Sequence, residues 1–397
     1  MAAGIQRRDR VETAIDDVPL MTVLINCLGA VSGGAISYIR NVIPRLFRLF
    51  DEAPAGITLK ILAHESQRDL LLVPDPSLVT VKGAQLTGYG RHLWERTHLK
   101  RIVDEMNVSV FFTPYQIGQR LKNVKQVFML RNMEPFFFSK YHYSAATRLR
   151  NLILRYETPH CLRRADRVIA VSEYVRRFVI DRLRIDANKC LTIYHGRDIS
   201  YAPRGEEAED RMVLERLGIG GNYILTCGSL LPYRRCEDVI LSFARVRKEG
   251  LRLVIAGSGT DRHYNRLVRQ TISDSGCTER VLPVGHVSKE MMQVLYRRAL
   301  LCVIATEVEA CPNIAIETMS SGCAIISSDR PPLPEMFDGS SIQFRSRDLE
   351  DLAARMRECL NSEPVRQEFK AKALKRAESF SWDKCARETY AALVDWQ

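Results

Sequence analysis

Two glutamates lie close together in a stretch that could bind a phosphorylated ligand. Glu309 and Glu317 flank Pro312 and Asn313, and Gly322 follows them. Proline before asparagine is typical of a helix start and glycine of a helix stop, so we expect a short helix here. Glu309 then lies in the loop before this helix, and Glu317 lies just over one turn inside it.

The start of this predicted helix could hold a phosphate. The N–H groups of Asn313 and Ile314 would be free, and a helix N-terminus favours negative charge. The carboxylate of Glu317 could accept two hydrogen bonds from a ribose diol, with Glu309 nearer to a sugar. The spacing alone also fits two glutamates on a solvated helix edge, so both interpretations stay open.

Two other turns combine features that suit an anion. Gly33 and Gly34 lie between an apolar run and a segment of helical period, where backbone N–H groups can approach an anion closely. Ser229 lies in the second turn, which ends in Arg234 and Arg235, and each guanidinium could donate two parallel hydrogen bonds to a diphosphate. A plain tight turn and a pair of exposed arginines are the alternatives.

Two series of short apolar runs, each separated by segments of helical period, must position these turns. This alternation predicts βαβ units and parallel sheets, so the fold class is α/β. Ligands bind to such sheets at the carboxyl ends of the strands, so we expect a cleft between two facing sheets. The predicted strands are Thr22–Asn26, Leu59–Ala63, Val79–Val81, Val108–Thr113, Gln126–Leu130, Arg167–Val171, Tyr223–Cys227, Arg252–Ala256, Val281–Val284, Leu301–Ile304 and Ala324–Ser327.

The chain length of 397 residues is enough for about two domains. Residues 1–20 are charged and predict a flexible N-terminal arm. A Gly/Pro-rich and charged stretch at 201–222 predicts a linker between domains at 21–200 and 223–375. Residues 376–397 predict a closing C-terminal helix, which in the simplest case caps the second domain.

Basic residues are concentrated in one part of the first domain. Residues 131–184 hold twelve Lys or Arg and five Asp or Glu, within a chain of net charge +11. This excess fits either a solvated helical face or a surface for an anionic partner, such as a lipid headgroup, a diphosphate-linked acceptor or an acidic membrane. Nucleic acid is disfavoured, because no interleaved aromatic residues or zinc-ligand spacing accompany the charge.

Neither a secretory signal nor a membrane-spanning run is expected. The eleven cysteines contain no Cys-x-x-Cys pair, and most lie in apolar runs, which is typical of buried thiols in a reducing compartment. We therefore expect a cytoplasmic protein, with peripheral attachment to the inner face of a membrane as an option.

The glutamate stretch resembles the Glu-x-seven-Glu motif of retaining glycosyltransferases of family 4, with Glu309 and Glu317 on its two glutamates. The resemblance continues in chain order from Met21 onward. Its other parts are the glycine loop Ser32–Ala35, the Val-Ser-Glu signature at Val171–Tyr174, the turn Tyr194–Gly196, Arg234 at the position of a diphosphate-binding lysine, and the turn Ala256–Gly259.

This resemblance implies a GT-B fold, in which two Rossmann-like domains with doubly wound parallel sheets face each other across a cleft. It implies transfer of a sugar from a nucleotide-diphosphate sugar to a glycan or lipid-linked acceptor with retention at the anomeric carbon, without a metal or other cofactor. Glu309 and Arg234 would be catalytic, and Arg131 and Asn132 would contact the acceptor or the sugar.

The sequence departs from the family pattern near the second glutamate, where Ala310, Cys311 and Pro312 replace Gly-Phe-Gly. Pro312 cannot donate an N–H group. Two alternative functions remain open. One is a non-catalytic partner protein of the same fold, recruited to an anionic surface, and the other is a nucleotide-sugar epimerase.

Overall fold

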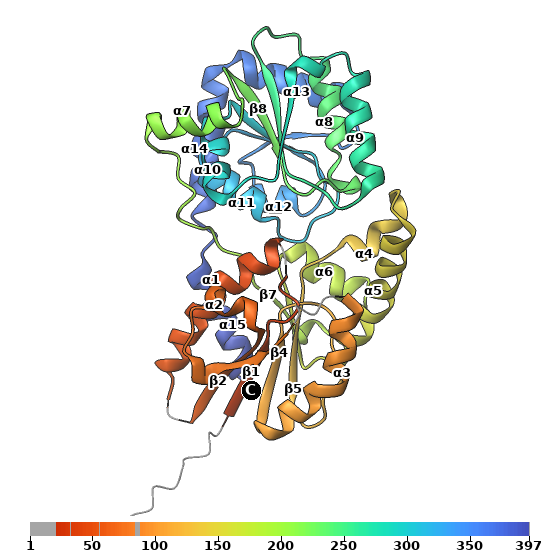
Figure 1. The fold of residues 1–397 in the computed structure, drawn as a ribbon, viewed down its shortest axis with the longest axis vertical. Coiled ribbons are helices and arrows are strands. Elements are labelled where there is room, and N and C mark those ends of the chain that lie inside the picture. The colour runs from red at the N-terminus through yellow and green to blue at the C-terminus, as the bar shows by residue number, and fades with distance from the viewer. Residues whose placement is uncertain (1–20, 32, 55, 84–87, 397) are drawn as a thin grey trace, which may run out of the picture.

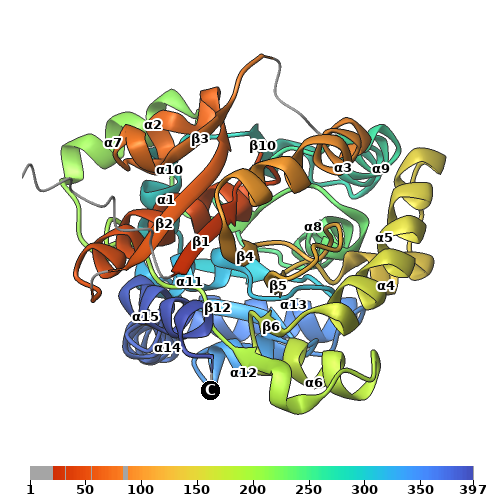
Figure 2. The same ribbon diagram turned by 90° about the horizontal axis from the view of Figure 1, so that it is seen from below.

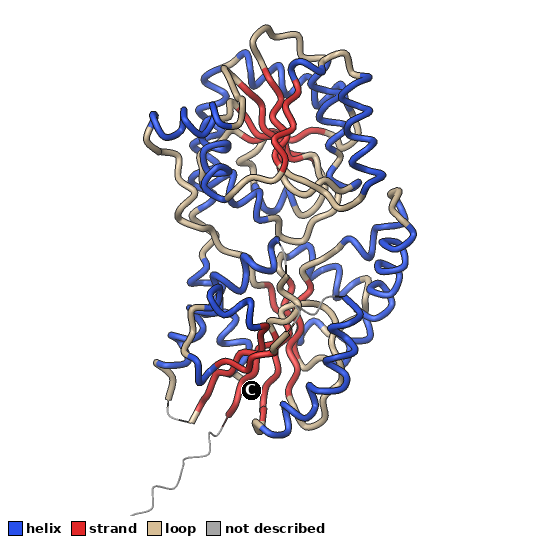
Figure 3. The backbone as a smooth tube through the Cα atoms, in the orientation of Figure 1, coloured by secondary structure: helices blue, strands red, loops and turns tan. Residues whose placement is uncertain are grey.

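The computed structural model describes residues 21–396 except residues 32, 55 and 84–87, together with the side chain of all but Tyr89 among them. The predicted arm 1–20 lies outside the described residues. Two lobes are stacked along the long axis, and each has a parallel sheet with helices on both of its faces (Figures 1 and 3). The expected pair of doubly wound α/β domains is therefore confirmed.

The first domain has a seven-stranded parallel sheet of order β3-β2-β1-β4-β5-β6-β7. The strands are β1 (Met21–Asn26), β2 (Ile57–His64), β3 (Leu78–Val81), β4 (Val108–Thr113), β5 (Lys125–Leu130), β6 (Arg167–Ala170) and β7 (Cys190–Thr192). The helices are α1 (Gly33–Asp51), α2 (Arg68–Leu71), α3 (Gly88–Glu105), α4 (Glu134–Phe137), α5 (Ala145–Arg164) and α6 (Glu173–Asp181).

The second domain has a six-stranded parallel sheet of order β10-β9-β8-β11-β12-β13. The strands are β8 (Tyr223–Cys227), β9 (Arg252–Ala256), β10 (Val281–Gly285), β11 (Leu301–Ile304), β12 (Ile325–Ser328) and β13 (Ile342–Phe344). The helices are α7 (Glu207–Arg216), α8 (Cys236–Ala244), α9 (Arg262–Asp274), α10 (Lys289–Arg298), α11 (Asn313–Ser320), α12 (Leu333–Phe337), α13 (Leu349–Asn361) and α14 (Glu363–Ala377).

In each sheet the strand order reverses at one point, between β1 and β4 in the first domain and between β8 and β11 in the second. The loops that leave these strands diverge, because the helices that follow them cover opposite faces of the sheet. A ligand crevice forms at such a switch point. All the motifs predicted to bind a diphosphate follow β1, β8 or β11.

The last helix, α15 (Trp382–Val394), packs against α1 of the first domain (Figure 2). Arg167, at the start of β6, donates hydrogen bonds to the carbonyls of Ala391 and Ala392 near the end of α15. Arg45 of α1 forms an ion pair with Asp383 at 2.8 Å. The closing helix therefore ties the chain back to the first domain and does not cap the second.

A second crossing between the domains runs beside this one. Arg197 pairs with Ser381 in an isolated parallel bridge. A Cβ atom on Gly196 would lie 2.0 Å from the backbone nitrogen of Trp382, so only glycine fits between the two segments. The predicted linker also contains α7, whose buried Asp210 bonds to Arg297 and Arg298 of α10.

All eleven cysteines are free thiols, and ten of them are buried. None of the helices within the described part of the chain is both long enough and apolar enough to cross a bilayer.

Candidate functional site

A cavity of about 730 Å³ lies between the two domains at the carboxyl ends of both sheets. Its walls come from the loops after β1, β4 and β5 in the first domain and the loops after β8, β9 and β11 in the second. It brings together ten of the eleven residues predicted for the site, which are Gly33, Gly34, Arg131, Asn132, Ser229, Arg234, Glu309, Asn313, Ile314 and Glu317.

Arg234 and Glu309 form a buried ion pair across the second-domain wall, with Nη2 and Oε1 2.9 Å apart. Burial lowers the pKa of Arg234, but Glu309 and Tyr233 raise it by more, so the guanidinium stays charged. Burial raises the pKa of Glu309, and Arg234 opposes that rise. Arg234 Nε and Nη1 are buried and have no hydrogen-bond partner among the described residues, so two donors remain for an anionic ligand.

Close backbone packing shapes the loop that carries Arg234. A Cβ atom on Gly257 would lie only 1.9 Å from the carbonyl oxygen of Gly228, and Gly257 has a φ of +148°. Both conditions require glycine. The N–H of Leu230 donates to the carbonyl of Ser258 at 3.0 Å, which joins the loops after β8 and β9. The predicted glycine turn after β9 therefore supports the arginine loop.

Helix α11 presents its N-terminus to the cavity. It begins at Asn313, and Pro312 at its N-cap has no side-chain capping bond, so the first N–H groups are open toward the cavity wall. The side-chain oxygen of Asn313 lies 2.9 Å from Nδ1 of buried His195, which stacks on Trp382. Burial and nearby Arg131 lower the pKa of His195 to about 3, so its imidazole is neutral at working pH.

Glu317 lies one turn into α11, as the sequence predicts. Its Oε2 accepts a hydrogen bond of 3.2 Å from the hydroxyl of Tyr296 on α10. Burial raises the pKa of Glu317 to about 7, with a smaller lowering by Tyr296. The carboxylate is therefore half protonated near neutral pH and costly to ionise without a ligand, whereas hydroxyl donors from a ligand would favour its charged form.

The first domain supplies a cation and a second helix N-terminus. Helix α1 begins at Gly33, and a Cβ atom on Gly34 would lie 3.3 Å from Arg131 Nη2 and 3.6 Å from Asn313 Nδ2. Burial lowers the pKa of Arg131 to about 10, and its guanidinium lies 5.7 Å from the ring centre of Tyr38. Among the described residues it has no carboxylate partner. Two helix N-termini and an unpaired arginine therefore converge from opposite domains.

Asn132 also lies at the cavity, but its side chain bonds locally. Its Oδ1 accepts from the N–H of Glu134 at 3.0 Å, and its carbonyl accepts from Gln116 Nε2 at 3.3 Å. Ser229 lines the cavity at the end of β8. Asn132 therefore holds the wall in shape, and Ser229 lies beside the site of Arg234.

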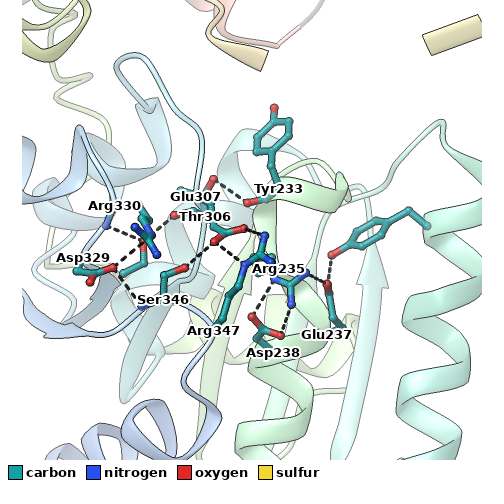
Figure 4. A network of polar contacts seen from close by, with 12 residues as sticks. Tyr233, Arg235, Glu237, Asp238, Thr306, Glu307, Asp329, Arg330, Ser346 and Arg347 are labelled. Atoms are coloured by element: carbon teal, nitrogen blue, oxygen red, sulfur yellow. Dashed lines mark hydrogen bonds and ion pairs between the residues drawn. The ribbon is translucent and has the colours of Figure 1, made fainter. Parts of the chain in front are cut away.

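Arg235 is the one predicted site residue that does not line the cavity. It adopts a left-handed conformation with φ of +53°, and its guanidinium forms ion pairs with Glu237 and Asp238 at 2.8 and 2.7 Å. Figure 4 shows it in a polar network that also contains Glu307 and Arg347. This network joins the loops after β8 and β11, so Arg235 helps to hold the loop of Arg234 in place.

The two domains contact each other at the Val-Ser-Glu signature, Val171–Tyr174. Glu335 of α12 in the second domain accepts hydrogen bonds of 2.8 Å from the N–H groups of Glu173 and Tyr174 at the start of α6. The hydroxyl of Tyr194 donates to the same carboxylate at 2.6 Å. A carboxylate at a helix N-terminus is electrostatically favourable, so this contact helps to hold the two domains together.

Sequence reasoning missed Tyr296 and Glu335. Tyr296 lies in an amphipathic helix, where an aromatic residue is typical of the core, and Glu335 follows three prolines in a region with no ligand-like pattern. Nothing in the spacing indicated that either would contact the predicted site or the other domain. Tyr194 and Glu173 were noted only as parts of family motifs.

A pair of facing parallel-sheet domains with a shared cavity at their switch points defines the GT-B class of folds. The second half of the chain matches the family model described as glycosyl transferases group 1 over residues 215–376. The first half matches the model described as Glycosyltransferase Family 4 over residues 33–201. Together the two matches place the chain among GT-B glycosyltransferases of the family-4-like type.

Individual relatives are distant. O-antigen chain mannosyltransferase B of Escherichia coli is 23% identical over 57% of this chain and 59% of its own length. A Campylobacter jejuni enzyme named as an N-acetylgalactosaminyltransferase acting on a diphospho-undecaprenol glycan is 23% identical over 58% of this chain and 60% of its own length. The matches span between 52% and 64% of the length of the first curated relatives.

Solved structures share the fold over nearly the whole chain. The Anabaena HepE protein in complex with UDP and glucose has a TM-score of 0.74 and 15% identity, covering 95% of this chain and all of that one. At this identity the similarity supports the fold alone.

Proposed function

We propose that the protein transfers a sugar from a nucleotide-diphosphate sugar to a glycan or lipid-linked acceptor. The observation that carries the proposal is the convergence of two helix N-termini with Arg131 and Arg234 on one cavity between the domains. Arg131 has no carboxylate partner among the described residues, and Arg234 keeps two buried donors unused. Such a site suits a diphosphate, because a buried cation without a carboxylate partner, unused guanidinium donors and free N–H groups are costly until an anion occupies them.

Each part of the proposed donor has a matching group in the cavity. Arg234 and the N-terminus of α11 hold the diphosphate, and Glu317 accepts hydrogen bonds from the ribose hydroxyls. Glu309, beside Arg234 in the loop before α11, lies toward the sugar. The loop at Gly33 and Gly34 closes over the diphosphate from the first domain.

The transfer step needs stabilisation of the departing diphosphate more than it needs a protein nucleophile. Charge develops on the leaving oxygen as the sugar bond breaks, and preorganised cations in a water-poor cavity stabilise that charge strongly. We propose that Arg234 supplies this stabilisation and that the leaving diphosphate accepts the acceptor's proton on the same face. This route retains the anomeric configuration and needs no metal or other cofactor.

The acceptor class follows from the charge of the first domain and from the relatives. The basic segment 131–184 suits an acceptor that carries a diphosphate or another anion. A relative is named for action on a diphospho-undecaprenol glycan, and another for O-antigen synthesis. We propose a hexosyl transfer in polysaccharide assembly on the cytoplasmic side of a membrane.

Transfer and hydrolysis assays over a panel of UDP, GDP and ADP sugars test the proposal. At least one donor is expected to turn over, with the product anomer unchanged by NMR and the rate unaffected by EDTA. Glu317→Ala should abolish donor use, whereas Glu350→Ala on an exposed part of α13 should not. Normal turnover by Glu317→Ala would refute the donor site, and conversion of a donor sugar without an acceptor would favour an epimerase.

A further inference from the structure

Helix α5 buries a mixed face and exposes an apolar stripe. Its face toward the protein includes Asn151 and Thr158 together with Cys161 and Leu162, whereas its outward face carries Leu149, Leu152 and Tyr156, which are 56%, 55% and 66% exposed. Positions 149, 152 and 156 follow helical spacing, so these three side chains form one stripe. The mixed face packs within this chain, but nothing among the described residues covers the apolar stripe.

The polar residues Asn151 and Arg150 of α5 have a clear structural role. Glu134, which lines the interdomain cavity, accepts hydrogen bonds from Asn151 at 3.1 Å and from Arg150 at 2.9 Å. The same helix thus forms part of the support for the cavity wall on one side and presents its apolar stripe on the other. A helix is about 10 Å in diameter, so the stripe lies within reach of an acceptor bound at the cavity.

The stripe is surrounded by positive charge. Helix α5 contains five arginines and one acidic residue, Glu157. Arg148 and Arg155 are exposed, and neither has a carboxylate partner among the described residues. Exposed leucines and tyrosine with flanking arginines are the composition of a helix that lies in a membrane interface.

We propose that the outward face of α5, with Leu149, Leu152 and Tyr156 inserted among the headgroups and Arg148 and Arg155 on lipid phosphates, docks the protein on an anionic membrane surface. Apolar side chains alone would suit many partners, but unpaired arginines on the flank select an anionic one. The proposal extends the proposed function, because it places the cavity next to the layer where a lipid-linked acceptor resides. It can be tested without any donor or acceptor.

The test is sedimentation of the full chain with vesicles of phosphatidylcholine, with and without phosphatidylglycerol. The unsubstituted protein should bind the anionic vesicles more tightly, and raised salt should weaken this binding. The variant Leu149→Ser/Leu152→Ser/Tyr156→Ser should bind about tenfold or more weakly. Arg148→Gln/Arg155→Gln should lose the preference for anionic vesicles.

The matched control is Met212→Ser/Leu267→Ser, which removes exposed apolar side chains from the second domain and should leave vesicle binding unchanged. Nucleotide binding should be the same in all these proteins, which separates this test from that of the donor site. The proposal is overturned if the unsubstituted protein does not bind anionic vesicles, if the α5 variant binds normally, or if the control loses binding equally. It is also overturned if the α5 variant converts a dimer into a monomer, because a second copy would then cover the stripe.

Discussion

The two glutamates of the cavity are both buried but have different partners. Glu309 has a guanidinium partner at 2.9 Å, whereas Glu317 has only the hydroxyl of Tyr296 and is otherwise desolvated. Burial raises the pKa of both carboxyl groups, but Arg234 opposes the rise at Glu309, whereas no cation among the described residues contacts Glu317. In the proposed function this difference assigns Glu317 to neutral hydroxyl donors and leaves Glu309 to steady the cationic wall.

The pH dependence of stability should reveal the raised pKa of Glu317. Its pKa of about 7 lies above the ordinary value of 4.5, so the folded protein binds the proton more tightly than the unfolded chain does. Glu317 therefore contributes fully to the free energy of unfolding below about pH 4.5. This contribution declines as the pH rises toward 7, by up to about 3 kcal/mol. Glu317→Gln removes this decline. Urea unfolding at pH 5 and pH 8 measures the free energy of unfolding of both proteins. Relative to the parent protein, the variant should be more stable at pH 8 than at pH 5. An equal difference in free energy at both pH values would contradict the assignment.

Substitutions of Arg234 should show how much of its role depends on its positive charge. Arg234→Ala removes the cation and leaves Glu309 buried without its partner, so nucleotide-diphosphate binding should weaken about 100-fold and the fold should lose about 3 kcal/mol. Arg234→Lys keeps the charge and should retain more of the nucleotide-diphosphate affinity and more of the stability than Arg234→Ala does. Calorimetric titration and urea unfolding measure the two effects. Similar binding by the alanine and lysine variants would show that the charge of Arg234 does not hold the diphosphate.

Among the elements, the longer apolar strands were easier to predict from sequence than the short edge strands β7 and β13. Runs such as Val108–Thr113 and Leu301–Ile304 are apolar enough to mark buried parallel strands, and the structure has both with the predicted bounds. The edge strands β7 and β13 have only three residues each, which is too short for a recognisable pattern. Helix α7 was hidden in the predicted linker, because it is mostly charged and becomes stable through Asp210 and its arginine partners.

The contact between α12 and α6 should control how firmly the domains are held together. Glu335 satisfies two N–H groups at the start of α6 and the hydroxyl of Tyr194, all from the other domain. Glu335→Ala should therefore increase amide exchange at Glu173 and Tyr174 while leaving the strands of both sheets protected. Hydrogen-exchange mass spectrometry measures this, with Glu350→Ala as the control. Uniformly faster exchange in both domains would instead indicate global destabilisation.

At the scale of the whole molecule, the sequence indicated the parts of the site but not how they face each other. Gly34, Arg131 and Asn313 were each selected from local pattern or resemblance, and the structure brings them within a few side-chain lengths of one another. That juxtaposition depends on the angle between domains, which is set by the paired crossings at Gly196 and Trp382 and by the packing of α15 on α1. Such contacts between distant segments leave no local periodicity. The prediction for Arg235 was wrong for a local reason, because its near neighbours Glu237 and Asp238 hold the guanidinium away from the cavity.

The central claim is that one nucleotide-diphosphate sugar is bound by both domains at once. The direct measurement is calorimetric titration of the preferred nucleotide sugar into the parent protein and into Arg131→Ala and Glu317→Gln, which alter opposite walls of the cavity. We predict that both variants bind at least about tenfold more weakly, since each loses a charge-assisted contact. Loss of affinity in Glu317→Gln with unchanged affinity in Arg131→Ala would contradict the claim, because the donor would then rest on the second domain alone.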